Sequence, residues 1–403
     1  FEALICPSIQ HYFKKKQVDA VYTDFSKAFD RVSHEILIKK LYAYGFTGPF
    51  LKWLNSYLTN RSFYVVVDGF QSSIFNITSG VPQGSHLGPI LFDIFINDLP
   101  NCFVHSTPYL FADDLKLTRV IDTHYDALLL QIDIDRLISW CTNNDMKLNV
   151  EKCSQITFTR KLNPIYFNYH INGLQLKVVD VVRDLGVLLD QKLTFIPHID
   201  NIIRKASTSL GFIIRNTKSF NPNTKILLFN CLVRSIVEYC VIVWRPHYAT
   251  HCLRLERLQK RFMRHLAYST GTAKSQSSYS KQLKRFKLAT LETRRDHLDL
   301  NFLVKILRSN IDCPQLLKLF NFNTPNKYPR HRIRLLSPPF RKTVLGSNSP
   351  VSRLCKLLNK IDKFDVFHTS FHKLNRASEA SVPRQRPAKR QNPNVSLGYV
   401  SSQ

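Results

Sequence analysis

Hydrophobic and polar positions follow two different periods along the first half of the chain. Val18–Thr23 is a β-branched and aromatic run, which predicts a buried strand. His34–Tyr44, Pro49–Leu58 and Tyr125–Asn144 carry apolar residues at helical spacing, which predicts amphipathic helices. Further strands are predicted at Phe63–Val67, Ile74–Thr78, Tyr109–Ala112, Leu115–Thr118, Ile156–Thr159 and Val178–Leu189.

Two turns connect some of these elements. Asp68-Gly69 lies between two of the predicted strands, and this dipeptide is a strong hairpin signal. The Gly-rich segment Ser79–Ser85 opens a helix that we expect to continue through Leu99.

Beyond residue 195 the pattern becomes helical and basic. Apolar spacing predicts helices over His198–Ile214, Thr224–Val243, His251–Leu266 and Leu288–Arg308. Beyond Pro314 the chain is rich in Pro and Asn, and Tyr328–Lys342 is strongly basic. From Arg376 onward, low hydrophobicity predicts a disordered tail.

The composition of the chain indicates a class of binding partner. The chain has 403 residues, and 57 Lys and Arg against 29 Asp and Glu give a net charge of +28. Such a field attracts polyanions, most commonly nucleic acid, although a basic soluble protein without such a partner is the plain alternative. No apolar run is long enough to cross a bilayer and Phe1 does not begin a signal peptide, so no membrane partner is expected.

The cysteines are nine in number and scattered, with no CxxC pair. This pattern argues against a disulfide framework and against a zinc site. Buried free thiols in a reducing compartment explain it better, so we expect an intracellular protein. The positions are Cys6, Cys102, Cys141, Cys153, Cys231, Cys240, Cys252, Cys313 and Cys355.

Acidic residues occur at the ends of predicted strands. Asp24 follows the first strand, and Asp113-Asp114 stands at the junction of two later ones. Carboxylates gathered there are costly to bury without a cation, and Mg²⁺ prefers such oxygen ligands. A plain hairpin turn is the alternative interpretation of Asp113-Asp114.

Five segments in order resemble the motifs of reverse transcriptases. Thr23–Asp30 is similar to the first palm motif, Ser79–Pro89 to the second and Phe111–Asp114 to the third. Leu148–Cys153 resembles the fourth, and Asp184–Asp190 resembles the primer-grip hairpin. The residues of these motifs are similar to those of non-LTR (LINE-like) retrotransposons of the jockey type. This likeness continues through Leu232–Tyr239, Val243–Pro246 and Asn348–Pro350.

The resemblance implies an α+β fold, with a palm formed by an antiparallel sheet and flanking helices. An α-helical thumb and a partly disordered basic tail would follow. We expect residues 1–190 to form the palm, with the fingers mostly missing, and 191–312 to form the thumb. Residues 313–375 would be a basic C-terminal region and 376–403 a disordered tail.

Metal ligands follow from the first and third motifs. The resemblance assigns Asp24 and Asp113 as the main ligands, the backbone carbonyl of Phe25 as a further ligand, and Asp114 as the residue that completes the cluster. Two Mg²⁺ ions, with Mn²⁺ as an alternative, would be held about 3.5–4 Å apart to activate a primer 3′-hydroxyl and stabilise pyrophosphate.

Nucleotide contacts are implied at four further residues. Phe29 occupies the steric-gate position, where an aromatic ring would clash with a ribose 2′-hydroxyl, although an ordinary core aromatic is the alternative. Gln83 and Gly84 lie in the second-motif turn, where small residues allow close approach of the backbone. Lys152 is the candidate to protonate or steady pyrophosphate, with a solvated surface lysine as the alternative.

Basic residues on the predicted thumb helices would contact the phosphates of a duplex, a sequence-independent and salt-sensitive mode of binding. A merely solvated helix face is the alternative. Tyr239 and Trp244, also in this region, are expected in the core. The candidate phosphate contacts are Arg204, Lys205, Arg257, Lys260, Arg261 and Arg264.

The resemblance implies an RNA-directed DNA polymerase fragment that acts on an RNA template, a DNA primer and dNTPs within a nuclear and cytoplasmic ribonucleoprotein. Fewer than 25 residues precede Asp24, so we expect the fingers and the family's endonuclease to be absent. One alternative is a catalytically inactive nucleic-acid-binding relic or host-adopted scaffold. A second alternative is an intron-type maturase, which the sequence of the predicted thumb fits less well than it fits the jockey type.

Overall fold

The computed structural model describes residues 16–270, 278–323, 335–340, 344–361 and 366. The chain divides into two compact units, Phe1–Gln282 and Leu283–Gln403. These units do not coincide with the regions expected from the motifs, which stay a prediction. The predicted tail from Arg376 onward lies outside the described residues.

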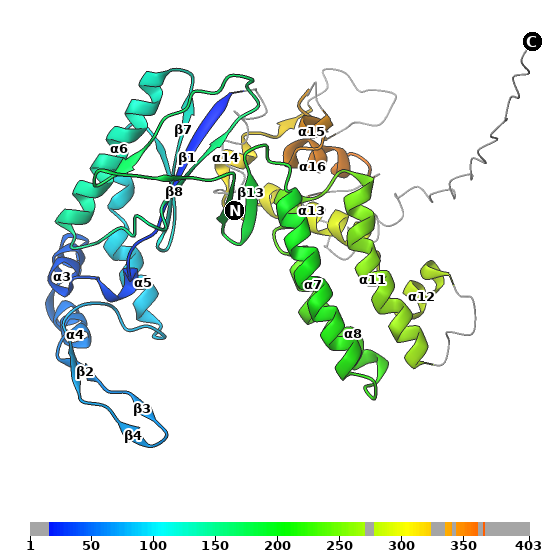
Figure 1. Cartoon of the computed structure of the whole chain (residues 1–403), viewed down its shortest axis with the longest axis horizontal. Coiled ribbons are helices and arrows are strands. Elements are labelled where there is room, and N and C mark those ends of the chain that lie inside the picture. Colours follow the sequence, from blue (N-terminus) through cyan, green and yellow to red (C-terminus); the bar gives the residue numbers. More distant parts are fainter. Residues whose placement is uncertain (1–15, 271–277, 324–334, 341–343, 362–365, 367–403) are drawn as a thin grey trace, which may run out of the picture. The chain divides into compact units, whose positions relative to one another are not determined.

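A five-stranded sheet forms the centre of the first unit, in the order β11-β8-β1-β7-β6 (Figure 1). The strand β1 (Gln17–Thr23) lies in the middle and pairs antiparallel with both β7 (Asp114–Ile121) and β8 (Ser154–Phe158). The edge strand β6 (Thr107–Phe111) is antiparallel to β7, whereas β11 (Lys177–Val178) runs parallel to β8.

Alternation along these strands sorts their side chains between two faces. Leu115 and Leu117 of β7 and Val21 of β1 are fully buried and belong to the main core. Their neighbours Tyr22 and Lys116 point to the opposite face, as the period of two in a strand requires. The main core is therefore on one side of the sheet. On the other side, Tyr22 and Lys116 lie on the same face as the buried apolar residues Val18, Ala20 and Ile156.

Two helices supply the opposite wall of this core: α5 (Leu87–Ile96) and α6 (His124–Asn143). A capping box at Thr123 begins α6, because its hydroxyl accepts from the Asp126 backbone N–H and the Asp126 carboxylate accepts in return. The predicted helix at Tyr125–Asn144 is confirmed. The helix expected to continue through Leu99 instead ends at Ile96, and a 3₁₀ turn (Leu99–Cys102) follows.

Between β1 and α5 the chain forms a 3₁₀ turn (Ala28–Asp30), α3 (His34–Ala43), α4 (Gly48–Leu58) and a long hairpin. The predicted Asp68-Gly69 turn is confirmed, with both residues at positive φ (50° and 85°). Its strands are shorter than expected: β2 (Arg61–Phe63), β3 (Val66–Val67), β4 (Phe70–Gln71) and β5 (Phe75–Ile77). The α+β class is confirmed by this arrangement of sheet and flanking helices; the sheet is antiparallel except for its edge strand β11.

The predicted strand Val178–Leu189 is wrong in its continuity. It divides into β11, β12 (Val181–Asp184) and β13 (Val187–Asp190), and the last two form a separate hairpin with a turn at Leu185-Gly186. Both turn residues have positive φ (43° and 84°), so the glycine provides the reversal. A second small hairpin, β9 (His170–Ile171) with β10 (Leu174–Gln175), precedes it.

Helices follow in the same unit: α7 (Ile196–Asn216), α8 (Pro222–Phe229) and α11 (Ala249–Ser269), with α12 (Tyr279–Arg285) across the unit boundary. The predicted helix Thr224–Val243 does not run unbroken. After α8 come a π-helical turn (Asn230–Arg234) and α9 (Ser235–Glu238), and α10 (Val241–Trp244) then starts beyond a break. Cys240 at the break has a φ of 50°.

The break at Cys240 has a packing cause. The Tyr239 hydroxyl donates to the Leu185 carbonyl, 2.8 Å away, and the Trp244 indole N–H donates to the Tyr239 carbonyl at 2.7 Å. Trp244 is buried as expected, whereas Tyr239 is 53% exposed, so its predicted core position is wrong.

In the second unit, α13 (Leu291–Leu307) packs against α16 (Pro350–Leu358). The Arg353 guanidinium and the Asp299 carboxylate form a buried ion pair at 2.8 Å between these helices. The unit also contains α14 (Pro314–Leu317), α15 (Val344–Ser347), and β14 (Asn321–Phe322) paired with β15 (Leu336–Ser337). Across the described part of the chain, no helix is long and apolar enough to cross a membrane.

Candidate active site

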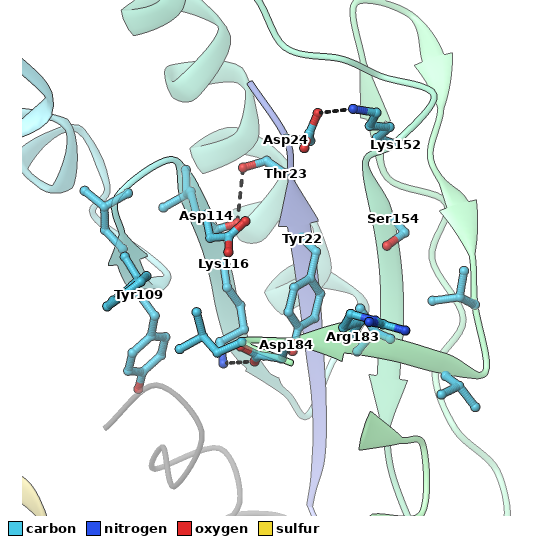
Figure 2. A pocket seen from close by; sticks show the side chains of 17 residues that line it. Tyr22, Thr23, Asp24, Tyr109, Asp114, Lys116, Lys152, Ser154, Arg183 and Asp184 are labelled. Atoms are coloured by element: carbon cyan, nitrogen blue, oxygen red, sulfur yellow. Dashed lines mark hydrogen bonds and ion pairs between the residues drawn. The ribbon is translucent and has the colours of Figure 1, made fainter. Parts of the chain in front are cut away.

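The ends of β1 and β7 bring two of the predicted carboxylates to one pocket. Thr23, the last residue of β1, pairs with Leu115, so Asp24 and Asp114 lie at the same end of adjacent strands. Both line a pocket of about 320 Å³ on the polar side of the sheet (Figure 2). Since the register of β1 on β7 fixes this juxtaposition, backbone pairing rather than side-chain contact creates the site.

Asp113 lies in the turn between β6 and β7, outside the residues that line the pocket. Its neighbour Ala112 has a φ of 49°, a left-handed conformation that side chains other than glycine rarely adopt. The reversal therefore falls at Ala112-Asp113, and Asp114 already pairs with Phe111 as the first residue of β7.

The electrostatics of the pocket favour a bound cation. The pKa of Asp114 is raised by partial burial and, in decreasing order, by the negative charges of Asp113, Asp184 and Asp24. Three carboxylates thus act on Asp114, and a cation beside it would lower that repulsion. Across the described residues, however, no group of three or more His, Cys, Asp or Glu side chains is close enough to form a metal site.

Two lysines and Arg183 provide the positive charge in the pocket. The Lys152 ammonium lies 3.4 Å from the Asp24 carboxylate, and the Lys116 ammonium lies 2.7 Å from that of Asp184 (Figure 2). Lys152 is 67% exposed, so its side chain can move away from Asp24 at little cost, whereas Lys116 is buried.

Backbone bonds fix the segment that carries Lys152 against Asp24. The Asn149 N–H donates to the Asp24 carbonyl at 2.8 Å, and the Ser26 N–H donates to the Lys147 carbonyl at 2.7 Å. Phe25, between them, is buried in the core. The first and fourth motifs are therefore joined at the mouth of the pocket.

The second-motif turn is attached to the end of the first motif. The Gly80 N–H donates to the Val32 carbonyl, and the Ser79 hydroxyl donates to the Asp30 carbonyl. Gly80 has a φ of 89°, and a Cβ there would approach the backbone of Asp30 to 2.8 Å. Only glycine fits this close approach.

Gln83 and Phe29 occupy this junction. The Gln83 amide donates to the Asp30 carboxylate at 2.8 Å, and the Phe29 ring stacks on Phe92 with centroids 4.3 Å apart. Gly84 has a φ of 81° with open space where a Cβ would be. None of these three residues lines the pocket.

Sequence reasoning missed the polar groups that share the pocket floor. Tyr109, Lys116 and Tyr22 are cross-strand neighbours in three adjacent strands, and Asp184 reaches them from the β12–β13 hairpin. Alternation along β7, where Lys116 stands between two leucines, places that lysine on the face opposite the core. Its partner was not predictable, because no pattern in the sequence links β7 to β12.

The six predicted phosphate contacts are all exposed and lie on two helices, Arg204 and Lys205 on α7 and the other four on α11. Arg257, Lys260, Arg261 and Arg264 stand at positions i, i+3, i+4 and i+7, so they form one stripe on α11. This stripe is a surface of high positive charge separate from the acidic pocket.

Comparisons with known proteins identify the family to which the chain is similar. Residues 7–214 match the family described as "Reverse transcriptase (RNA-dependent DNA polymerase)". The chain is 30% identical over 271 residues to the RNA-directed DNA polymerase from mobile element jockey of Drosophila funebris, covering 63% of this chain and 29% of that protein. It is 31% identical over 268 residues to the probable RNA-directed DNA polymerase from transposon BS of Drosophila melanogaster, covering 64% and 30%.

The chain thus spans about three-tenths of the length of these relatives. Among solved structures, apo telomerase from Candida tropicalis is 12% identical, with a TM-score of 0.38 and coverage of 71% of this chain and 48% of that one.

Proposed function

Because this chain belongs to the reverse transcriptase (RNA-dependent DNA polymerase) family, we propose that its acidic pocket is a polymerase active centre of the non-LTR retrotransposon type. The proposed reaction is RNA-directed DNA synthesis. The primer 3′-hydroxyl oxygen attacks the α-phosphorus of a dNTP paired with the RNA template, the bond to pyrophosphate breaks, and the primer grows by one nucleotide.

One observation carries this proposal: strand register brings Asp24 and Asp114, from the first and third motifs, into a single pocket. The two aspartates are about 90 residues apart in sequence, and an accidental turn at Asp113-Asp114 would not need a partner carboxylate there. The raised pKa of Asp114 adds support, since clustered carboxylates with shifted pKa values are common at functional sites.

Reverse transcriptases generally use divalent metal ions, and the donors here suit them, since carboxylate and carbonyl oxygens are the ligands of Mg²⁺. We propose Asp24, Asp113, Asp114 and the Phe25 carbonyl as ligands of two Mg²⁺ ions, with Mn²⁺ as a substitute. Bound there, the ions would lower the pKa of the primer hydroxyl and offset the charge of pyrophosphate. Lys152 would leave Asp24 and turn to the pyrophosphate oxygens.

The remaining predicted residues receive roles in substrate selection. We propose that Phe29 excludes ribonucleotides and that Gln83 and Gly84 contact the template and the incoming dNTP. The basic stripe of α11, with Arg204 and Lys205 of α7, would hold the phosphates of the primer–template duplex.

We propose a functional role for each region expected from the motifs. Residues 1–190 would act as palm, 191–312 as thumb and 313–375 as a basic C-terminal region, with 376–403 as a tail. We further propose that the chain works in a ribonucleoprotein of the cytoplasm and nucleus.

Primer extension on a poly(rA)/oligo(dT) duplex with Mg²⁺ tests the proposal, with the Asp113→Ala/Asp114→Ala variant as control. Extension by the parent chain but not by the control is expected. No extension by the parent, with salt-sensitive duplex binding retained, would contradict the proposal. It would favour a catalytically inactive nucleic-acid-binding relic.

A further inference from the structure

The β12–β13 hairpin is attached to the main sheet in two different ways. At its base, backbone bonds join it to β8: the Thr159 N–H donates to the Gln191 carbonyl at 3.3 Å, and the Val179 N–H donates to the Gln155 carbonyl at 3.0 Å. Its strands nevertheless form a separate two-stranded sheet. The end of the hairpin nearest the pocket is therefore held by side chains.

The Tyr239 hydroxyl bond to the Leu185 carbonyl is one of these attachments, and the ion pair between Lys116 and Asp184 is another. The ammonium and carboxylate are 2.7 Å apart, and only 9% and 7% of the two side chains are exposed. The Tyr22 hydroxyl donates to the same carboxylate oxygen at 2.9 Å. Charges buried this deeply cannot exchange partners with solvent, so each requires the other to remain in place.

Aromatic rings enclose the lysine from both sides. Its ammonium lies 5.6 Å from the ring centroid of Tyr22 and 5.1 Å from that of Tyr109, the residues paired with Lys116 on the adjacent strands. Cation–π attraction restricts the ammonium to the position from which it meets Asp184 (Figure 2).

This pair stands between the carboxylates and the hairpin tip. Lys116 follows Asp114 by two residues on the same strand face, and Asp184 is the last residue before the Leu185-Gly186 turn. Asp24, Asp114, Lys116 and Asp184 all line the same pocket. A shift of Asp184 would therefore change the distance between the hairpin tip and the carboxylates.

We propose that Lys116 and Asp184 are positioning residues that hold the tip of the β12–β13 hairpin at a fixed distance from Asp24 and Asp114. A primer end that rests on the hairpin then meets the reacting phosphate in line. This role rests on the proposed polymerase function, and the docking itself stands independently of it.

Hydrogen exchange on the full chain tests the docking, with Asp184→Asn as the variant. The expected result is faster exchange of amides in Val181–Asp190, with exchange in Val18–Thr23 unchanged. The matched control is Asp180→Asn, which neutralises an exposed carboxylate that accepts a hydrogen bond from Gln191 at the hairpin base and should leave the tip as protected as in the parent. Unchanged exchange in Asp184→Asn would overturn the proposal.

Pre-steady-state burst kinetics of nucleotide addition, with primer–template in excess over the protein, test the positioning. Asp184→Asn should lower the rate constant of the burst by about 100-fold, because misplacement by an ångström has that effect on a chemical step. The affinities for duplex and dNTP should change less than about twofold. A purely structural role would lower the burst amplitude, which counts active molecules, and leave the rate constant intact; that result would overturn the proposal.

Two milder variants guard against misfolding. Tyr22→Phe removes one hydrogen bond to Asp184 and should give a smaller loss of the same kind, and Lys116→Arg keeps the charge and should retain most of the rate. Equal losses in Lys116→Arg and Asp184→Asn would contradict the proposal. A parent chain that extends no primer would remove the positioning role, whereas exchange would still decide whether the pair docks the hairpin.

Discussion

The acidic pocket and the basic stripe of α11 are both proposed to meet the same nucleic acid, yet they are built in opposite ways. Asp24 and Asp114 owe their positions to backbone pairing, and their neighbours are few and specific. The cations of α11 are exposed on long side chains along one helix of 21 residues. The chemistry of the pocket therefore depends on the positions of a few atoms, whereas duplex binding by the stripe depends on its total charge.

This difference predicts how each region responds to substitution. Loss of one carboxylate removes a contact that no neighbour can replace, whereas loss of one cation leaves others to attract the same phosphates. The two regions should also separate in what they affect, the pocket in turnover and the stripe in binding.

The largest effect should come from Asp24→Asn. The variant keeps the shape of the side chain but loses the charge, so primer extension should fall by about 10³-fold or more, as expected when charge stabilisation of the transition state is lost. Duplex affinity should stay within about twofold. Extension assays measure turnover and fluorescence anisotropy measures duplex affinity on the same preparation. A parallel loss of affinity would contradict the expected separation of the two regions.

Next in size is Gly80→Ala, which strains the joint between the first and second motifs. The new Cβ would approach the Asp30 backbone to 2.8 Å at a φ of 89°, so unfolding in urea should require about 1–3 kcal/mol less. Gly69→Ala is the matched control, because φ there is 85° and the space around it is open. Equal losses in both variants would show that φ alone, and not the contact with Asp30, sets the requirement.

A pH effect of similar size is expected where helix α7 joins the hairpin. The His198 imidazole accepts from the Leu188 N–H at 3.2 Å, and burial lowers its pKa to about 4 from an ordinary 6.5. As the pH falls below 6.5, the His198 imidazole therefore binds a proton in the unfolded chain but stays neutral in the folded chain. The free energy of unfolding should therefore fall as the pH drops from 6.5 towards 4, by about 3 kcal/mol in total.

Urea unfolding at pH 7 and pH 5 measures this loss, with His198→Gln as the comparison. The variant should show a weaker dependence over the same range, because it has no imidazole to protonate. An identical pH dependence in parent and variant would assign the titration to other groups.

The smallest effect should follow Arg257→Gln. Removal of one cation from the stripe should weaken duplex binding by about two- to threefold and reduce the slope of log affinity against log salt by about 0.9. Lys177→Gln, on an exposed edge strand, is the control and should change neither quantity. A large loss of turnover in Arg257→Gln with unchanged binding would break the comparison.

The sequence predicted those features that local chemistry controls. The strand before Asp24, the Asp68-Gly69 hairpin and the long helix near Tyr125 follow from periodicity and turn residues alone. The break at Cys240 did not follow, because the contact of Tyr239 with the distant Leu185 backbone and the local bond from Trp244 to the Tyr239 carbonyl override a helical pattern.

The candidate site divides in the same way. The motifs located the aspartates of the first and third motifs, at the ends of β1 and β7, whose convergence depends on a simple antiparallel register. The pairing of Lys116 with Asp184 joins residues 68 positions apart through a hairpin that is absent from the main sheet. A tertiary contact of that kind leaves no trace in spacing or composition, so only the structure could supply it.

The register of β1 on β7 also governs which insertions and deletions the gene could tolerate. Removal of one codon within β7 would shift every later side chain of the strand to the opposite face, so that Lys116 would enter the core and Leu117 would face the pocket. The same event between β9 and β10, at the exposed Asn172-Gly173 turn, would alter only a loop. Length variation among copies of this sequence should therefore gather in such loops and spare the strands that carry the aspartates.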